Sequence, residues 1–182
     1  MAEVYVGPKF QTIFTRRQSP TDERLPELLS WCRQWAQAGW IAKAVGNLSC
    51  RTAAGFIITP TGTNPATLTT ADFVEVLGVD EKETRVIGIH EPSSECRMHA
   101  GIYAARPDVN AIFHGHYAPA LQLTGVAITE HEIAYGTPAL AMETMQALGN
   151  GNFVIMRGHG FVAVGSGMRA AHTAAVDALS RL

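Results

Sequence analysis

Apolar residues recur every three or four positions in one long segment near the N-terminus, which is the spacing of an amphipathic helix. This pattern begins after Thr21-Asp22, a helix-cap signal, and stops near Gly39. Three further helices are predicted at about 94–105, at 137–148 and from about 167 to the end. In the second of these, Thr137 caps the helix and Pro138 occupies its first turn. A shorter helix is predicted at 118–123.

Short apolar runs bounded by turn residues predict the strands. The segments 49–52 and 56–59 read as a hairpin, and 73–77 and 84–88 form a second strand pair. Three more strands are expected at 109–113, 152–156 and 161–164. Residues 1–20 lack clear periodicity and are interpreted as an N-terminal arm or loop. Residues 21–182 then form one α/β domain with a mixed, largely antiparallel central sheet.

Composition and charge narrow the class of protein. The 182 residues are 47% hydrophobic and 16% charged, with a formal net charge of −2, so no basic stripe favours nucleic acid as a partner. No apolar stretch approaches the roughly 18 to 20 residues of a membrane helix, and the N-terminus does not read as a secretory signal. The odd set Cys32, Cys50 and Cys96 has no metal-ligand spacing, which favours reduced thiols in a cytoplasmic protein. Cys96 is interpreted as a packed residue rather than a nucleophile.

The strongest candidate chemistry is a His-Gly-His motif directly after a predicted buried strand. Alternate residues of a strand point to one face, so the imidazoles of His114 and His116 can reach one metal ion. A third imidazole, His159, lies between two glycines after another apolar run, and Glu95 stands at the start of a predicted helix. Three histidines and a glutamate at element edges predict an open catalytic metal site.

Three short loops are rich in glycine and small polar residues, namely 46–49, 59–63 and 92–94. Glycine lets backbone N–H groups approach an anion, and serine or threonine hydroxyls add donors without bulk. Taken singly, each loop is more typical of an ordinary turn or helix cap than of an anion site. No lysine or arginine lies in them, so an anion would depend on amides and hydroxyls.

Six motifs, taken in order along the chain, carry a resemblance to a known family. They are Gly46-Asn47-Leu48-Ser49, Ile58-Thr59-Pro60-Thr61-Gly62, Pro92-Ser93-Ser94-Glu95-Cys96-Arg97-Met98-His99, Arg106-Pro107-Asp108, His114-Gly115-His116 and Gly158-His159-Gly160. Over about residues 22–182 the chain resembles the class II aldolase/adducin family, and its motifs are most similar to those of the L-fuculose-1-phosphate aldolases. The resemblance implies a three-layer α/β/α catalytic domain over residues 21–182.

The resemblance also implies an activity and its residues. A zinc-dependent aldolase would cleave a ketose 1-phosphate reversibly into dihydroxyacetone phosphate and an aldehyde through an enediolate. One Zn²⁺ per subunit would be bound by His114, His116 and His159, with Glu95 as base and potential fourth ligand. The implied phosphate pocket consists of Gly46, Asn47, Thr61, Gly62, Ser93 and Ser94. Family members form homotetramers with active sites at subunit interfaces, and the same assembly is expected here.

Two departures leave the sugar open. The segment between His116 and His159 is shorter than in the aldolases, where a longer insertion bears a substrate-side tyrosine. The chain also ends at Leu182, before the C-terminal tail that covers the aldolase site. Three alternatives share this scaffold, and the first is a methylthioribulose-1-phosphate dehydratase. The second is a ribulose-phosphate 4-epimerase, which Glu95 argues against because an aspartate is expected at that position. The third is a metal-free adducin-like interaction domain, which the retained metal ligands argue against.

The other histidines and one tyrosine are weighed individually. His99 lies four residues after Glu95 and either orients the carboxylate or packs inside. His131 is interpreted as part of a solvated turn rather than of the pocket mouth, and His90 and His172 as structural. Tyr117 either donates a proton to the aldehyde oxygen or is a packed aromatic residue.

Overall fold

The computed structural model describes residues 7–182, and within them the strands form one nine-stranded sheet in the order β1-β5-β4-β3-β2-β6-β9-β8-β7. The strands are β1 Gln11–Arg16, β2 Asn47–Arg51, β3 Phe56–Ile58, β4 Val74–Val79, β5 Glu83–Ile87, β6 Ala111–Gly115, β7 Ala127–Ile128, β8 Phe153–Met156 and β9 Gly160–Gly165. The helices are α1 Leu25–Gln37, α2 Cys96–Ala105, α3 Pro138–Leu148 and α4 Met168–Leu179, with 3₁₀ turns η1 Thr70–Asp72 and η2 Ala118–Gln122. Only the two edge pairs, β1·β5 and β7·β8, are parallel.

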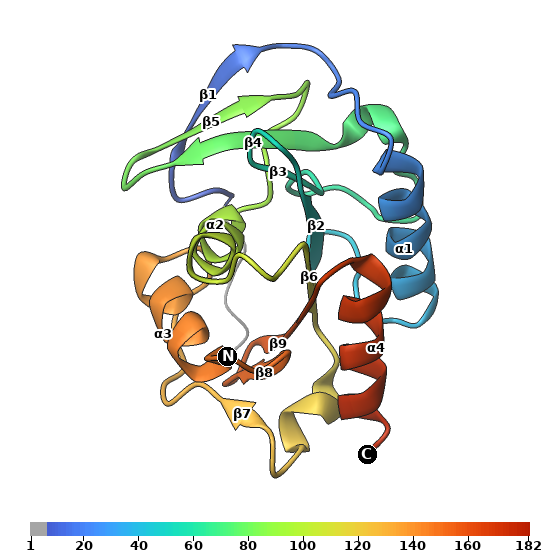
Figure 1. The fold of residues 1–182 in the computed structure, drawn as a ribbon, viewed down its shortest axis with the longest axis vertical. Coiled ribbons are helices and arrows are strands. Elements are labelled where there is room, and N and C mark those ends of the chain that lie inside the picture. Colours follow the sequence, from blue (N-terminus) through green and yellow to red (C-terminus); the bar gives the residue numbers. More distant parts are fainter. Residues whose placement is uncertain (1–6) are drawn as a thin grey trace.

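Helices cover both faces of the sheet, so the predicted three-layer α/β/α fold is confirmed (Figure 1). Helices α1 and α4 pack on one face in a cluster that includes Leu28, Trp35 and Phe113. Helices α2 and α3 pack on the other in a cluster that includes Ile102 and Ile112. The neighbours Ile112 and Phe113 point to opposite faces because successive side chains of a strand alternate.

The same alternation decides which polar residues face helix α2. In β2, Leu48 and Cys50 belong to the core under α1 and α4, so Asn47 and Ser49 project toward α2. In β6, His114 shares the face of Ile112. Antiparallel pairing places Asn47 opposite His114. The sheet therefore presents polar side chains from two adjacent strands to the N-terminal end of α2.

The main elements predicted from the pattern are confirmed, including both hairpins and four helices. The Thr137 cap is confirmed as well, since its Oγ1 accepts the Leu140 N–H at 3.2 Å. Helix α1 begins later than its cap signal, at Leu25, and Asp22 instead accepts from the backbone N–H of Arg24 at 2.9 Å.

The loop interpretation is wrong for residues 11–16, which form edge strand β1 in parallel pairing with β5. Three of its six residues are exposed, so it leaves little apolar pattern, although Phe14 packs against the core under α2. Residues 1–6 of the expected arm lie outside the described residues. The predicted helix at 118–123 is the 3₁₀ turn η2, and β7, only two residues long, was not predicted.

All three cysteines are buried and free of disulfide bonds. Burial raises the pKa of the Cys96 thiol to about 12, which agrees with a packed residue rather than a nucleophile. Within residues 7–182 no helix has the length and apolar content needed to cross a membrane.

Candidate metal centre and substrate pocket

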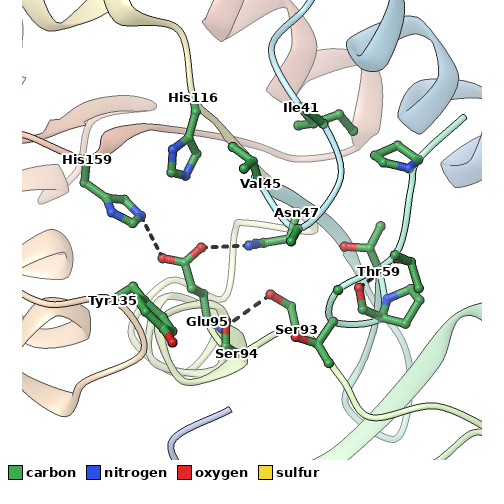
Figure 2. A pocket seen from close by; sticks show the side chains of 18 of the residues that line it. Ile41, Val45, Asn47, Thr59, Ser93, Ser94, Glu95, His116, Tyr135 and His159 are labelled. Carbon is green, nitrogen blue, oxygen red and sulfur yellow. Dashed lines mark hydrogen bonds and ion pairs between the residues drawn. The ribbon is translucent and has the colours of Figure 1, made fainter. Parts of the chain in front are cut away.

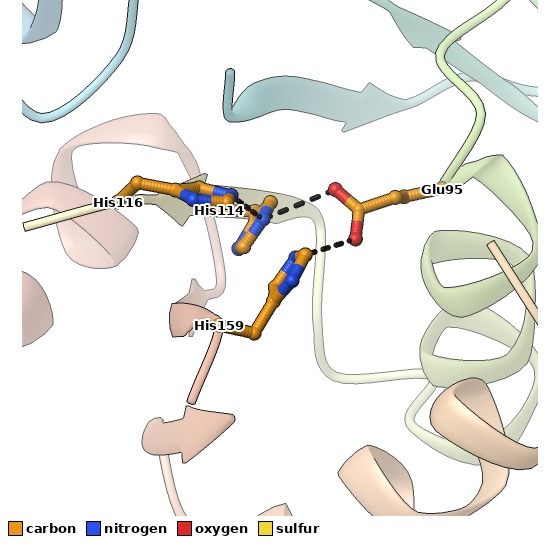
Figure 3. Close-up of side chains that lie close together, drawn as sticks. All are labelled: Glu95, His114, His116 and His159. Atoms are coloured by element: carbon orange, nitrogen blue, oxygen red, sulfur yellow. Dashed lines mark hydrogen bonds and ion pairs between the residues drawn. The ribbon is translucent and has the colours of Figure 1, made fainter. Parts of the chain in front are cut away.

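The four residues proposed to hold a metal come together in space. Each of Glu95, His114, His116 and His159 offers one ligand atom, and these atoms all lie within 4.8 Å of one another. Figure 3 shows the three imidazoles and the carboxylate converging on a common point from separate parts of the chain. The sequence separation is up to 64 residues, so the cluster is a product of the fold.

The His-Gly-His motif delivers two imidazoles from the end of β6. The Nε2 atoms of His114 and His116 lie 2.9 Å apart. Gly115 between them faces the opposite side, where a Cβ would lie 2.6 Å from the Phe161 ring and 3.1 Å from the Trp35 ring. A larger residue there would push the strand away from its packing and displace both imidazoles.

His159 lies in the turn between β8 and β9, in a backbone conformation that depends on its glycine neighbours. Gly158 has φ +69°, in the left-handed region that favours glycine. A Cβ on Gly160 would lie 2.5 Å from the Gly115 carbonyl oxygen and 3.1 Å from the His114 ring. The glycines therefore let the turn approach β6 closely enough for the imidazoles of His114 and His159 to stack at 5.2 Å.

Glu95 immediately precedes helix α2 and places its carboxylate between two imidazoles. Oε1 lies 3.0 Å from His159 Nε2, and Oε2 lies 3.0 Å from His114 Nε2. Burial by itself raises the pKa of the Glu95 carboxyl, but the two imidazoles, His114 above all, outweigh it and hold that pKa well below its usual range. The carboxylate is therefore ionised at neutral pH, as a base must be.

The donor set fits a divalent cation. His114 Nδ1–H donates to the Phe161 carbonyl oxygen at 2.9 Å, the kind of outer hydrogen bond that fixes a metal-ligating imidazole and aims its other nitrogen at the ion. Burial, together with the neighbouring imidazoles, lowers the pKa of His116 to about 3, so His116 is neutral and able to ligate. Three imidazole nitrogens and a carboxylate oxygen are ligands typical of zinc and its neighbours.

A pocket of about 700 Å³ opens beside this cluster. Figure 2 shows the Glu95 carboxylate directed toward His159, with Ser93 and Ser94 beside Glu95 and Thr59 farther along the pocket lining. All six predicted phosphate residues line this pocket, namely Gly46, Asn47, Thr61, Gly62, Ser93 and Ser94.

The loops that carry these residues are tied together by backbone hydrogen bonds. The Thr61 N–H donates to Glu91 and the Ser93 N–H donates to Thr59, both at 3.1 Å. The Ser93 hydroxyl accepts the backbone N–H of Glu95 at 3.3 Å. The 59–63 and 92–94 loops thus form one wall, and their role in holding phosphate stays a prediction.

The side chain of Asn47 is already engaged, in a way that the sequence did not suggest. Its Nδ2 donates to Glu95 Oε2 at 2.8 Å, and its Oδ1 lies 2.6 Å from His99 Nε2. Asn47 therefore contacts the predicted base as well as lining the pocket. His99 is buried, which confirms that it packs inside, whereas its role in orienting the carboxylate stays a prediction.

The remaining histidines take structural positions. His131 is exposed and lies 3.3 Å from Glu143, and His90 lies 3.1 Å from Asp72. His172 accepts the Trp35 indole N–H at 3.2 Å. Tyr117 packs against the core under α1 and α4 and is not among the residues that line the pocket.

Sequence reasoning favoured a solvated turn over the pocket mouth for Glu132, and so missed the wall that residues 132–135 form. Glu132 reaches the Gly158 turn, where a Cβ on Gly158 would lie 2.5 Å from its carboxyl carbon. Tyr135 is buried and carries the Lys9 ammonium 4.2 Å above its ring. No motif marks this segment, because its apolar and acidic residues follow neither helical nor strand periodicity.

Comparison with known proteins identifies the family. The family model of the "Class II Aldolase and Adducin N-terminal domain" matches residues 26–179. The 5-methylthioribulose-1-phosphate/5-deoxyribulose-1-phosphate aldolase of Rhodospirillum rubrum is 30% identical over 168 residues, which cover 82% of this chain and 74% of that protein. The L-fuculose phosphate aldolase of Escherichia coli K12 is 28% identical over 75% of this chain and 70% of its own length.

Solved structures agree on the fold. An L-fuculose 1-phosphate aldolase superposes with a TM-score of 0.76 at 24% identity, covering 90% of this chain and 84% of its own. The chain therefore belongs to the class II aldolase and adducin family, as its motifs predicted. Its relatives and its His₃Glu cluster make it a class II aldolase, a lyase with a candidate metal site, rather than a metal-free adducin-like domain.

Proposed function

We propose that this protein is a zinc-dependent aldolase that cleaves a ketose 1-phosphate reversibly into dihydroxyacetone phosphate and an aldehyde. The observation that carries the proposal is the position of Glu95, whose ionised carboxylate lies 3.0 Å from two imidazoles of the candidate metal site and lines the same pocket as the Ser93-Ser94 loop.

The protein's own residues account for the proton transfer. In the condensation direction Glu95 would accept a proton from the hydroxymethyl carbon of dihydroxyacetone phosphate, and in the cleavage direction it would return that proton to the enediolate. A metal ion held by His114, His116 and His159 would supply Lewis acidity that favours negative charge on the substrate.

The phosphate end of the substrate fits the wall made by loops 59–63 and 92–94. The pocket residues there are glycine, serine and threonine, whose N–H and hydroxyl groups can donate to a phosphate without bulk. Residues 132–135 also line the pocket and carry Glu132, whose carboxylate repels a phosphate, and the side chains of Ile133 and Tyr135. We therefore orient the substrate with its phosphate toward Ser94 and its aldehyde half toward residues 132–135.

Two substrates are proposed, one from each group of aldolase relatives. They are L-fuculose 1-phosphate, with a polar aldehyde half, and 5-methylthioribulose 1-phosphate, with an apolar thioether end. The wall at residues 132–135 offers one carboxylate and several apolar groups, so both remain candidates. A dehydratase acting on the second compound stays as the alternative outcome.

The test is to incubate the zinc-loaded protein with each ketose 1-phosphate and to measure dihydroxyacetone phosphate with a coupled NADH-dependent reductase. An aldolase releases one dihydroxyacetone phosphate per substrate consumed. A dehydratase consumes methylthioribulose 1-phosphate with loss of water and releases none. Absence of any substrate loss with either compound would contradict the proposal.

We further propose that the protein is a homotetramer with active sites at subunit interfaces, as the family resemblance implies. Light scattering coupled to size-exclusion chromatography tests this directly. Four times the mass of one chain is expected, and a monomer at micromolar concentration would contradict the assembly.

A further inference from the structure

A chain of buried hydrogen bonds runs from the sheet and helix α2 to the carboxylate of Glu95. Asn47 and Ser49 lie on one face of β2, while His99 and Tyr103 of α2 follow Glu95, which caps that helix, at intervals of four residues. The two rows face each other, and all five residues are at most 5% exposed. Nothing in the proton transfer described above uses His99, Ser49 or Tyr103.

The chemistry of the groups fixes the direction of every hydrogen bond in this chain. A carboxylate only accepts, so Asn47 donates Nδ2–H to Glu95 Oε2 at 2.8 Å. The Asn47 Oδ1 must then accept from His99 Nε2–H, 2.6 Å away. His99 Nδ1 is consequently the acceptor for the Ser49 hydroxyl at 2.6 Å.

The far end of this hydrogen-bond chain completes the same arrangement. The single hydroxyl proton of Ser49 is used on His99, so the Tyr103 hydroxyl must donate to Ser49 Oγ, 2.8 Å away. With the His99 proton on Nδ1, Ser49 would accept from His99 and donate to Tyr103, and the Asn47 oxygen would face an unprotonated Nε2. The Glu95 carboxylate therefore selects the Nε2–H tautomer of His99 through Asn47, and the Nε2–H of His99 in turn holds the orientation of the Asn47 amide.

We propose that His99 is a positioning residue that acts on Glu95 through Asn47. With the amide locked, Asn47 presents only its N–H to the carboxylate, and Glu95 is kept in the orientation that faces His114 and His159. A flipped amide would turn its oxygen toward the carboxylate and its N–H toward the His99 donor, which is unfavourable at both ends. The catalytic role of this row of hydrogen bonds rests on the proposed function, but its effect on the candidate metal site does not.

Two substitutions at one position separate positioning from packing. His99→Gln places an amide nitrogen near the position of Nε2 and can still donate to Asn47. His99→Asn is one methylene shorter and reaches only the Ser49 side. Both retain a polar amide in a buried site, and Ile102→Val, in the same helix, controls for a general loss of packing.

The first measurement is the dissociation constant for Zn²⁺, obtained by competition with a chromophoric chelator. Loss of an outer hydrogen-bonding partner weakens a metal site by about 10- to 100-fold, so His99→Asn should weaken binding by about tenfold. His99→Gln and Ile102→Val should stay within about threefold of the unaltered protein. Equal weakening by the Gln and Asn variants would overturn the proposal.

The decisive control repeats His99→Asn in a Glu95→Gln background, because a residue that acts only through the carboxylate loses its effect once the carboxylate is gone. The Zn²⁺ dissociation constant should then change by less than about twofold. The same tenfold weakening in both backgrounds would show that His99 acts on packing alone. Should both His99 variants fail to fold, Ser49→Ala, which removes the hydroxyl bonded to His99 Nδ1, takes their place in the same cycle and is judged by the same criterion.

A second readout uses ketose 1-phosphate cleavage. His99→Asn should lower kcat by about 10- to 100-fold while KM changes by less than about threefold, because the base rather than the phosphate wall is disturbed. If even the unaltered protein cleaves no ketose 1-phosphate, the proposed function fails, and the Zn²⁺ measurements still decide the role of His99.

Discussion

The Nε2 atoms of His114 and His116 face each other at 2.9 Å, although a metal in tetrahedral coordination would hold two ligand nitrogens roughly 3.3 Å apart. A displacement of a few tenths of an ångström therefore converts a hydrogen bond between the two imidazoles into a chelate. The His114 ring is already anchored from behind by the Phe161 carbonyl, so little ordering remains to be done when a cation binds.

The first prediction concerns metal content. Purified protein should carry about one divalent metal per chain, zinc by preference, and His114→Ala should lose nearly all of it because the buried nitrogen that faces both His116 and Glu95 is removed. Elemental analysis measures this, with the exposed His131→Ala as the matched control that keeps its metal. Equal metal in His114→Ala and the unaltered protein would refute the assignment.

Glu95→Gln should fold and retain metal yet lose turnover by at least about 10²-fold, because the amide is nearly isosteric with the carboxylate but cannot accept the proton. Steady-state kinetics on the zinc-loaded variant measures this loss. A decrease of only a few-fold would mean that another group is the base.

Phosphate recognition is tested by comparing a ketose 1-phosphate with its free sugar. A hydrogen bond to a charged group contributes about 1.5 to 3 kcal/mol, so several such bonds make the phosphorylated substrate preferred by orders of magnitude. Ser94→Ala should lower kcat/KM for the phosphorylated compound and leave the metal content intact. Comparable turnover of both compounds would mean that loops 46–49, 59–63 and 92–94 are only turns.

The turn that carries His159 should tolerate no side chain at Gly158. Its φ of +69° costs an L-residue about 1 to 2 kcal/mol, and a Cβ would lie 2.5 Å from the Glu132 carboxyl carbon. Gly158→Ala should therefore weaken zinc binding by shifting His159. Gly167→Ala is the matched control, since its Cβ would meet nothing within 4 Å, and it should bind zinc normally.

The metal-free protein should lose stability as the pH falls below neutrality. Burial is the main cause that lowers the pKa of His99 to about 3 in the folded state, whereas an unfolded histidine has a pKa of about 6.5. The unfolded state thus binds more protons between these values, so the contribution of His99 is complete above about pH 6.5 and declines as the pH falls toward 3.

Urea unfolding at pH 5.5 and 4.5 checks this sign. Replacing His99 by Gln should reduce the slope of unfolding free energy against pH by about 1.4 kcal/mol per pH unit, the equivalent of one proton. Ile102→Val should lower stability without changing the slope. An unchanged slope in His99→Gln would contradict the assignment of a neutral buried imidazole.

The sequence predicted the elements that carry strong periodicity and the four residues that the fold brings together as a candidate metal site. His114, His116, His159 and Glu95 were found because each stands at the edge of an apolar run, a position that can be read without knowing how the runs pack. The sequence did not predict where the Asn47 side chain points, because an asparagine in a Gly-Asn turn can face either a ligand or a carboxylate.

The parts that were missed depend on long-range packing. Strand β1 pairs with β5, about seventy residues away, and leaves almost no pattern of its own. The spacing of Glu95, His99 and Tyr103 indicates one face of a helix. Their partners Asn47 and Ser49 could be identified only from the fold, which places β2 opposite α2. The pocket wall at residues 132–135 has no periodicity from which it could be inferred.

The measurement that tests the central claim most directly is hydrogen exchange into dihydroxyacetone phosphate in D₂O, followed by NMR with no aldehyde present. This half-reaction needs the metal, Glu95 and the phosphate wall, and it is independent of which aldehyde the enzyme uses. The account predicts exchange of one of the two hydrogens of the hydroxymethyl carbon, lost on removal of zinc, restored by its return, and reduced by at least about 10²-fold in Glu95→Gln. No exchange above the buffer rate with zinc-loaded protein, or exchange undiminished in Glu95→Gln, would contradict it.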